Sequence, residues 1–195
     1  MRQGISIENE VVFIVIDLLG PSLMDLFTLC GSKFSLKTTL MITYQLLDRM
    51  QHMHLRNFIH RDLKPDNIMM GLGEDSQNLF IVDFGLTRSI IDSKTGKHIK
   101  FKGGKNLVGT CRYVSVNSHL GHELSRRDDL VSVGYIMIEM LTGSLPWIGM
   151  HSGKPSARYR KIGDFKGSIS NKRLCKNCPQ AFLDYMDYVT SMQFE

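Results

Sequence analysis

One short segment of this 195-residue chain is dense in charged and amide side chains: His60-Arg61-Asp62-Leu63-Lys64-Pro65-Asp66-Asn67. Sixteen residues after Asn67, beyond a short apolar run, comes Asp83-Phe84-Gly85. A carboxylate such as Asp62 can accept a proton from a hydroxyl group. Amide and carboxylate oxygens, such as those of Asn67 and Asp83, are ligands that hard cations prefer. The spacing therefore predicts proton-accepting and cation-binding groups on two neighbouring loops.

These two segments resemble two motifs of eukaryotic-type protein kinases, in the same order and with a hairpin between them. The first fits the catalytic-loop pattern H-R-D-L-x-x-x-N at every fixed position, and the second is the D-F-G motif. The resemblance implies phosphate transfer from ATP, which depends on positioning and charge neutralisation. It implies that Asp62 and Lys64 are catalytic, with Lys64 placing positive charge near the γ-phosphate. It also implies that Asn67 and Asp83 bind Mg²⁺.

Further segments resemble the casein kinase 1 family of serine/threonine protein kinases. Asp17-Leu18-Leu19-Gly20-Pro21-Ser22-Leu23 is similar to the hinge of that family. Ser115-Val116-Asn117 stands where the family carries Ser-Ile-Asn and where most kinases carry Ala-Pro-Glu. Residues 125–130 and 143–147 also match the family closely, so the resemblance covers nearly the whole chain.

The resemblance also implies which residues contact the nucleotide. The backbone of Asp17 and Leu19 is expected to hydrogen-bond the adenine, with Ile16 behind it. Met69 and Val82 match positions that line the floor of the adenine pocket.

The family favours substrates that are acidic or already phosphorylated. Its anion pocket maps here to Arg112, Gly149 and Arg158, and the planar fork of arginine can bind phosphate oxygens in pairs. The other interpretation of Arg158 is a solvated residue in a basic loop, Lys154 to Lys161.

Several residues are expected to support this chemistry without taking part in it. By the resemblance, Asp129 braces the backbone of the catalytic loop and Thr110 contacts Asp62. Phe84 is apolar and should pack so that it holds the preceding aspartate, while Gly85 permits a sharp turn. His52 and His54 lie near a helix end, where a contact with the helix dipole is favoured over metal binding.

Periodicity predicts the elements that must position these loops. Between residues 87 and 125 the chain is polar and weakly periodic, which predicts a long loop. The predicted class is α+β: a protein-kinase-like fold with a mainly helical large lobe and a remnant of the small-lobe sheet. The individual elements expected are a strand at 11–16 after an earlier strand and a turn at 8–10, a short helix capped by Ser22 or Asp25, a long helix at 36–55 capped by Ser35, a hairpin at 68–82, a core helix at 128–141 stopped by Gly143 and Pro146, and a last helix from Ala181.

By the resemblance, residues 1–195 form one incomplete kinase domain with three parts. Residues 1–16 correspond to the last small-lobe strands, 17–22 to the hinge and 23–195 to a large lobe without its final helices. A complete kinase also carries a Gly-rich loop, a third-strand lysine and a partner glutamate that clamp the nucleotide phosphates. This chain shows none of the three ahead of its hinge. Two interpretations stay open: part of an ATP-dependent protein kinase, or a non-catalytic, kinase-derived binding module.

Composition and charge indicate which partners and which cellular compartment to expect. Its net charge of +5 favours acidic or phosphorylated protein partners. The basic residues are scattered and not interleaved with aromatics, which argues against direct nucleic-acid binding. No apolar run reaches membrane-spanning length and the first residues do not form a signal peptide. We therefore expect an intracellular monomer, cytoplasmic or nuclear, without a membrane partner. Cys175 and Cys178 lack two further ligands for zinc and are expected to be ordinary thiols.

Overall fold

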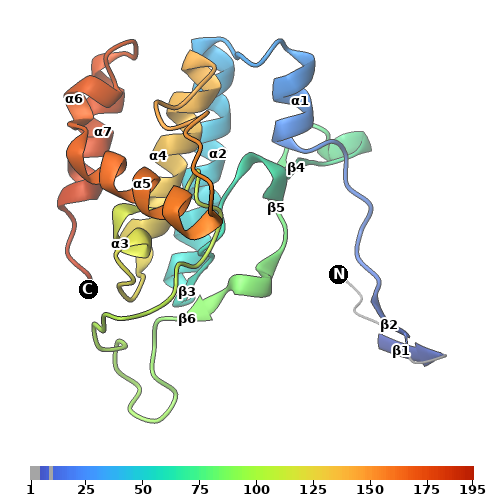
Figure 1. Ribbon diagram of the computed structural model, residues 1–195. Helices are drawn as coiled ribbons and strands as arrows, with labels where there is room; N and C mark the ends of the chain where they lie inside the picture. The colour runs from blue at the N-terminus through green and yellow to red at the C-terminus, as the bar shows by residue number, and fades with distance from the viewer. Residues whose placement is uncertain (1–4, 9–10) are drawn as a thin grey trace.

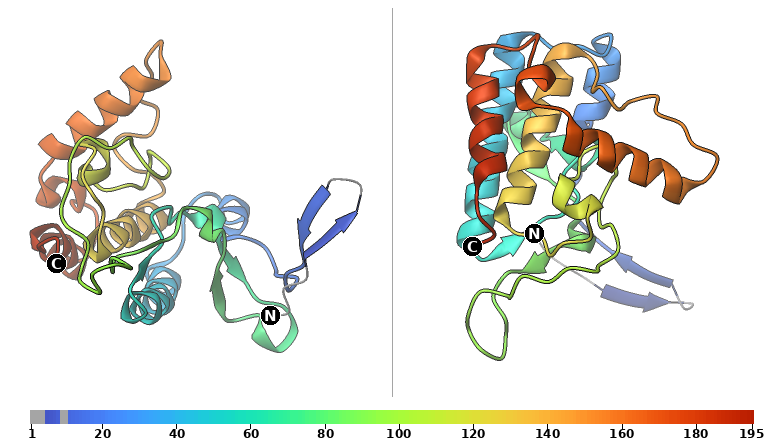
Figure 2. Two further views of the ribbon diagram at one scale, coloured as in Figure 1. Left: turned by 90° about the horizontal axis from the view of Figure 1, so that it is seen from below. Right: turned by 60° about the vertical axis from the view of Figure 1, so that its left-hand side comes forward.

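The computed structural model describes residues 5–8 and 11–195, and far more of these residues lie in helices than in strands. Three helices lie side by side: α2 (Leu36–Leu55), α4 (Arg126–Thr142) and α7 (Gln180–Ser191) (Figure 1). A fourth, α5 (Pro155–Ser168), runs across them (Figure 2). The predicted α+β class with a mainly helical body is confirmed. The shorter helical elements are α1 (Leu23–Leu29), α3 (Val116–His119), α6 (Asn171–Leu174) and the 3₁₀ turns η1 (Pro65–Asn67), η2 (Gly73–Asp75) and η3 (Phe84–Leu86).

The strands form three separate antiparallel pairs within the described residues. An earlier strand pairs with the predicted one, although β2 ends at Ile14 and not at Ile16. The turn expected at residues 8–10 lies partly outside the described residues, which omit 9 and 10. The predicted hairpin is confirmed, with Met69 opposite Phe80. The pairs are β1 (Ile5–Glu8) with β2 (Val11–Ile14), β3 (Phe58–Ile59) with β6 (Arg88–Ser89), and β4 (Ile68–Met70) with β5 (Leu79–Ile81).

The pair β3–β6 was not predicted, because two-residue strands leave no periodicity to detect. It nevertheless positions the two polar loops. Strand β3 ends directly before His60, and β6 begins two residues after η3. The hydrogen-bonded pair therefore fixes the start of the first loop beside the end of the second.

The predicted helix caps are present. Ser35 caps α2 by accepting a hydrogen bond from the backbone N–H of Thr38 at 3.1 Å. Ser22 caps α1, and Asp25 completes a capping box by accepting from the Ser22 backbone N–H at 2.9 Å. The core helix α4 stops at Gly143, whose φ of +89° places it in the left-handed region that favours glycine.

Helix α4 is the centre of the core. It is buried on most faces, as its all-round apolar pattern predicts, and it packs against both α2 and α7. Gly134 allows α7 to come close, because a Cβ at this position would lie 2.3 Å from Met186 Sδ.

Two sequence-based expectations are corrected. The alternative interpretation of Arg158 placed it in a basic loop from Lys154 to Lys161, but residues 155–161 are the first half of α5, which has Pro155 in its first turn. The buried stripe of α5 consists of Ile162, Gly163 and Lys166, and a lysine in that stripe hid the helical pattern. Residues 87–125 are mainly loop as predicted, but they also contain β6 and α3.

The Ser35 cap can be tested by its contribution to stability. Ser35→Ala leaves the Thr38 N–H without its side-chain acceptor, so we expect the free energy of unfolding in urea to fall by about 1 kcal/mol. Lys33→Ala, at an exposed position just before the cap, is the matched control and should change it little. Equal values for both variants would contradict the assigned cap.

Candidate active site

The side chain of Asp62 is the meeting point of the catalytic-loop residues. Asp62 is 8% exposed, and its Oδ1 accepts hydrogen bonds from the N–H and the hydroxyl of Thr110 at 2.8 and 2.6 Å. Its Oδ2 lies 3.2 Å from Lys64 Nζ. Asn67 Nδ2 donates to the main-chain oxygen of Asp62 at 3.0 Å and lies 3.5 Å from Oδ2. The structure thus brings Asp62, Lys64, Asn67 and Thr110 together.

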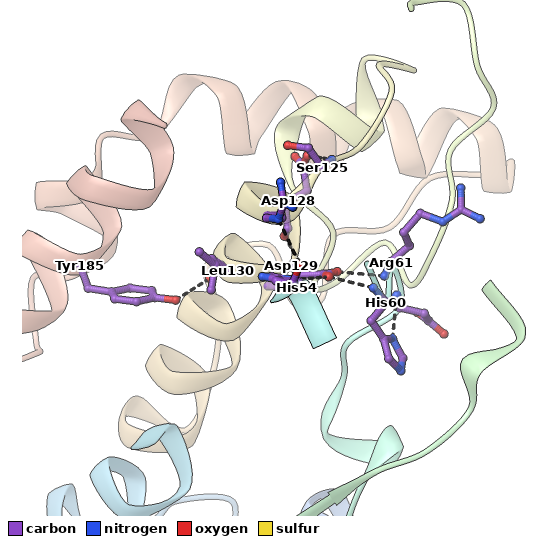
Figure 3. A network of polar contacts seen from close by, with 11 residues as sticks. His54, His60, Arg61, Ser125, Asp128, Asp129, Leu130 and Tyr185 are labelled. Atoms are coloured by element: carbon purple, nitrogen blue, oxygen red, sulfur yellow. Dashed lines mark hydrogen bonds and ion pairs between the residues drawn. The ribbon is translucent and has the colours of Figure 1, made fainter. Parts of the chain in front are cut away.

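Asp129, at the start of α4, holds the backbone on which Asp62 sits. Its two carboxylate oxygens accept from the backbone N–H groups of His60 and Arg61 at 2.8 and 2.9 Å (Figure 3). Asp129 is 2% exposed. Arg61 has a φ of +70°, a conformation unfavourable for an arginine, and the two hydrogen bonds offset that strain.

His54 is a member of the site that sequence reasoning missed. It was expected to contact the helix dipole, but its Nε2 lies 3.0 Å from Asp129 Oδ2 and its side chain is buried. The expectation failed because the last turn of α2 passes beside the start of α4. The two residues are 75 positions apart in the sequence, and nothing in the local pattern indicates their contact.

Asp128, the residue before this brace, holds a different loop. Its Oδ1 accepts from the Ser115 hydroxyl at 2.6 Å and from Asn117 Nδ2 at 2.9 Å. Its Oδ2 accepts from the Ser125 backbone N–H at 2.8 Å, which forms the helix cap (Figure 3). The Ser-Val-Asn segment is therefore fixed to α4 by both of its polar side chains.

His60 links the catalytic loop to the strand that leads into Asp83. Its ring is fully buried, and Nε2 lies 3.1 Å from the main-chain oxygen of Val82. Its Nδ1 accepts from the backbone N–H of Asp62 at 3.3 Å, which leaves the ring proton on Nε2 to be donated to Val82.

The segment Asp83-Phe84-Gly85 differs from expectation in two respects. The left-handed residue is Asp83, with a φ of +61°, and not Gly85. Asp83 caps η3 by accepting from the Gly85 N–H at 3.3 Å, and short polar residues tolerate this conformation. Phe84 is 53% exposed and not buried as expected, with the His60 ring beside it at 5.6 Å between centroids.

A cavity of about 730 Å³ opens beside Asp83. The hinge forms one wall, and main-chain hydrogen bonds from Gly20 to Met70 and from Met70 to Pro21 attach the hinge to β4. Met69 does not line the cavity, in contrast to the expectation. The residues predicted for the nucleotide that do line it are Ile16, Asp17, Leu19, Val82 and Asp83.

The residues predicted for the phosphate pocket lie on three separate segments of the chain. The Arg112 guanidinium lies 3.5 Å from the Glu139 carboxylate. Arg158 is exposed on α5 and Gly149 is exposed after α4, with a φ of +84°.

Gly109 marks the place where the loop carrying Thr110 crosses the catalytic loop. Its φ is +92°, and a Cβ there would lie 2.3 Å from the main-chain oxygen of Arg61. Only glycine satisfies both conditions. The crossing explains how Thr110 reaches Asp62.

Lys166, on α5, is a second residue that sequence reasoning missed. It is 4% exposed, and its Nζ donates to the main-chain oxygens of Cys111 and Val114 at 2.9 and 2.7 Å. Burial lowers the pKa of Lys166 to about 7, and a charged Cys111 thiolate would oppose that shift. A buried lysine leaves no signal in the sequence other than its place in an apolar stripe.

The fold and this grouping of side chains are those of a kinase-type protein. The chain matches the protein kinase domain over residues 3–190, and it belongs to that family. Members of the family use ATP and Mg²⁺ to phosphorylate proteins. In the part of the chain that the structure describes, no helix combines the length and apolar character needed to cross a bilayer.

Replacing Asp129 tests the brace. In Asp129→Asn one of the two carboxylate oxygens becomes an NH₂ group, so one of the buried N–H groups of His60 and Arg61 faces another donor and loses its acceptor. We expect the free energy of unfolding to fall by about 1–3 kcal/mol. Asp184→Asn, at an exposed position on α7, should stay within about 0.5 kcal/mol of the wild type. If urea denaturation showed a similarly small change for both variants, the claim that Asp129 holds the catalytic loop would be refuted.

The depressed pKa of Lys166 predicts a pH dependence of stability. The folded chain releases this proton near pH 7, while the unfolded chain holds it to about pH 10.5. Between those values the unfolded state binds more protons, so stability rises with pH, by at most about 1.4 kcal/mol per unit. The groups facing Lys166 are the Cys111 thiol, the ring of His119 and the phenol of Tyr135.

The measurement is urea denaturation of the wild type and of Lys166→Met at pH 7, 8 and 9. We expect the free energy of unfolding of the wild type, relative to that of Lys166→Met, to increase as the pH rises. A difference that is constant over this range would show that Lys166 does not titrate there.

Proposed function

We propose that this protein is an ATP-dependent serine/threonine protein kinase of casein kinase 1 type. It would transfer the γ-phosphate of ATP to serine or threonine in proteins that are acidic or already phosphorylated. The observation that carries the proposal is the grouping of Lys64, Asn67 and Thr110 around the carboxylate of Asp62.

In this mechanism Asp62 orients the substrate hydroxyl and accepts its proton. Thr110 donates twice to Oδ1, so that oxygen is largely occupied and Oδ2 is the better placed to accept. Lys64 lies 3.2 Å from Oδ2 and supplies positive charge where the transferred phosphate gains negative charge. Both roles depend on a fixed carboxylate, which the two Thr110 hydrogen bonds provide.

The donor set fits Mg²⁺. Asn67 uses its Nδ2 on the Asp62 backbone, which leaves Oδ1 as a neutral oxygen ligand. Asp83 is exposed at the edge of the hinge-lined cavity and carries a charged oxygen ligand. The two would hold Mg²⁺, which supplies charge neutralisation for the phosphates when bound. Two protein ligands suffice for an ion that also binds a nucleotide.

The hinge is the proposed adenine site. The backbone of Asp17 and Leu19 lies on the wall of the 730 Å³ cavity, with Ile16 and Val82 as apolar neighbours. Residues 1–16 are proposed as the last small-lobe strands, 17–22 as the hinge and 23–195 as the large lobe.

The casein kinase 1 type is supported by the role of the Ser-Val-Asn segment. Ser115 and Asn117 both donate to Asp128, so this segment has a physical function that an Ala-Pro-Glu segment would fulfil differently. The family's preference for acidic or phosphorylated substrates would be served by Arg112, Gly149 and Arg158. Of these, Arg158 is exposed and free for such a contact.

The test is transfer of radiolabelled phosphate from Mg·ATP to an acidic protein, and to the same protein after prior phosphorylation. Asp62→Asn should lower the rate by about 10²–10⁴-fold, the contribution of a positioned proton acceptor. Asp66→Asn is the matched control, since Asp66 is an exposed carboxylate in the same loop. Equal rates for wild type and Asp62→Asn would refute the proposal that this protein is a kinase using Asp62.

A parallel measurement separates the two interpretations of the sequence. Nucleotide binding is followed by thermal shift with Mg·ATP, for wild type and for Asp83→Asn. Binding without any phosphate transfer would identify a non-catalytic binding module. Transfer that is lost in Asp83→Asn, with folding intact, would support the kinase.

A further inference from the structure

Every residue of the segment 110–114 is held by a side chain from another element. Thr110 donates to Asp62, as described above. Trp147 Nε1 donates to the main-chain oxygen of Arg112 at 2.8 Å. The Tyr113 hydroxyl donates to Glu139 at 2.6 Å. The two remaining residues, Cys111 and Val114, are held through their main-chain oxygens, which both accept from Lys166 Nζ.

The buried position of Lys166 is energetically unfavourable for a positive charge, although two aromatic rings face it. Its Nζ lies 4.8 Å from the ring centroids of both Tyr135 and Trp147. No carboxylate forms an ion pair with it among residues 5–8 and 11–195. Burial of an unpaired ammonium is unfavourable, and an apolar side chain of similar length would fill the same space at lower cost. Carbonyl groups and aromatic faces recover only part of that cost.

The position of Lys166 suggests what it does there. The Cys111 carbonyl is one peptide away from Thr110, whose hydroxyl and N–H hold Asp62 Oδ1. Val114 lies directly before Ser115, which is fixed to α4 through Asp128. Lys166 therefore ties together the two ends of the segment 110–114, whose first residue holds Asp62 and whose last residue precedes the Ser-Val-Asn segment.

We propose that Lys166 is a positioning residue for phosphate transfer. Its Nζ, which carries two or more N–H donors whether charged or neutral, holds the carbonyls of Cys111 and Val114 on α5, and so holds Thr110 against Asp62. This inference rests on the proposed kinase function. Lys166 acts through the segment 110–114 and touches neither substrate nor nucleotide.

The test compares three variants: Lys166→Met, which keeps length but not charge, Lys166→Arg, which keeps charge, and Lys161→Met, an exposed control on the same helix. For Lys166→Met we expect kcat to fall by about 10–100-fold, as for a misplaced reacting group, with Mg·ATP binding unchanged. Lys166→Arg should recover part of that loss, and Lys161→Met should match the wild type. An unchanged kcat in Lys166→Met would overturn the proposal.

A second readout follows the segment without using activity. The rate of alkylation of Cys111 is measured by peptide mapping, with the buried Cys175 as internal reference for unfolding. We expect ~10-fold faster labelling of Cys111 in Lys166→Met and no change at Cys175, because only the segment loosens. Equal increases at both thiols would mean that Lys166 serves global folding alone, and the proposal would fail.

The two readouts keep the inference separate from the proposed function. If the wild type transfers no phosphate, the proposed function fails, and labelling of Cys111 still shows whether Lys166 holds the segment. If labelling rises in Lys166→Met while kcat stays unchanged, the segment is held but its position does not matter for transfer.

Discussion

Two consecutive buried carboxylates at the start of α4 hold the loops of the site together. Asp129 accepts from the backbone of the catalytic loop, and Asp128 from Ser115 and Asn117. Burying two adjacent negative charges is energetically unfavourable. It is tolerated here because their oxygens accept short hydrogen bonds and lie at a helix N-terminus. The central helix of the core is thus also the anchor for both loops, so the site inherits the rigidity of the core.

The order of the chain explains why this anchor works. The catalytic loop precedes α4 by about sixty residues, and the loop bearing Thr110 comes just before it. His60 extends the connection to the strand before Asp83 by donating to Val82. Asp62 and Asn67 lie on the catalytic loop, whose backbone Asp129 holds, and their side chains are fixed further by Thr110 and by the Asp62 main chain. Backbone anchoring and direct side-chain contacts therefore act together at this site.

Helices α1, α2, α4 and α7 and the contact of Asp62 with Thr110 could be predicted because their signals are local or belong to a motif. The caps at Ser22 and Ser35 and the apolar pattern of α4 were visible in short windows. His54 and Lys166 could not be found in this way, because each acts on a partner distant in sequence and resembles a surface residue of a helix. The exposed ring of Phe84 and the left-handed Asp83 depend on how η3 is capped, which composition does not reveal.

Gly109 has a consequence for how this protein could change. The chain there passes so close to the Arg61 carbonyl that the crossing excludes every side chain. Substitution at this point would push the two loops apart and not merely alter a surface. Diversification of what the protein recognises is therefore confined to the flanking positions, where Cys111 and Arg112 have partly accessible side chains. Gly109 therefore keeps the contact between the two loops fixed. Cys111 and Arg112 can change without altering the geometry at Asp62.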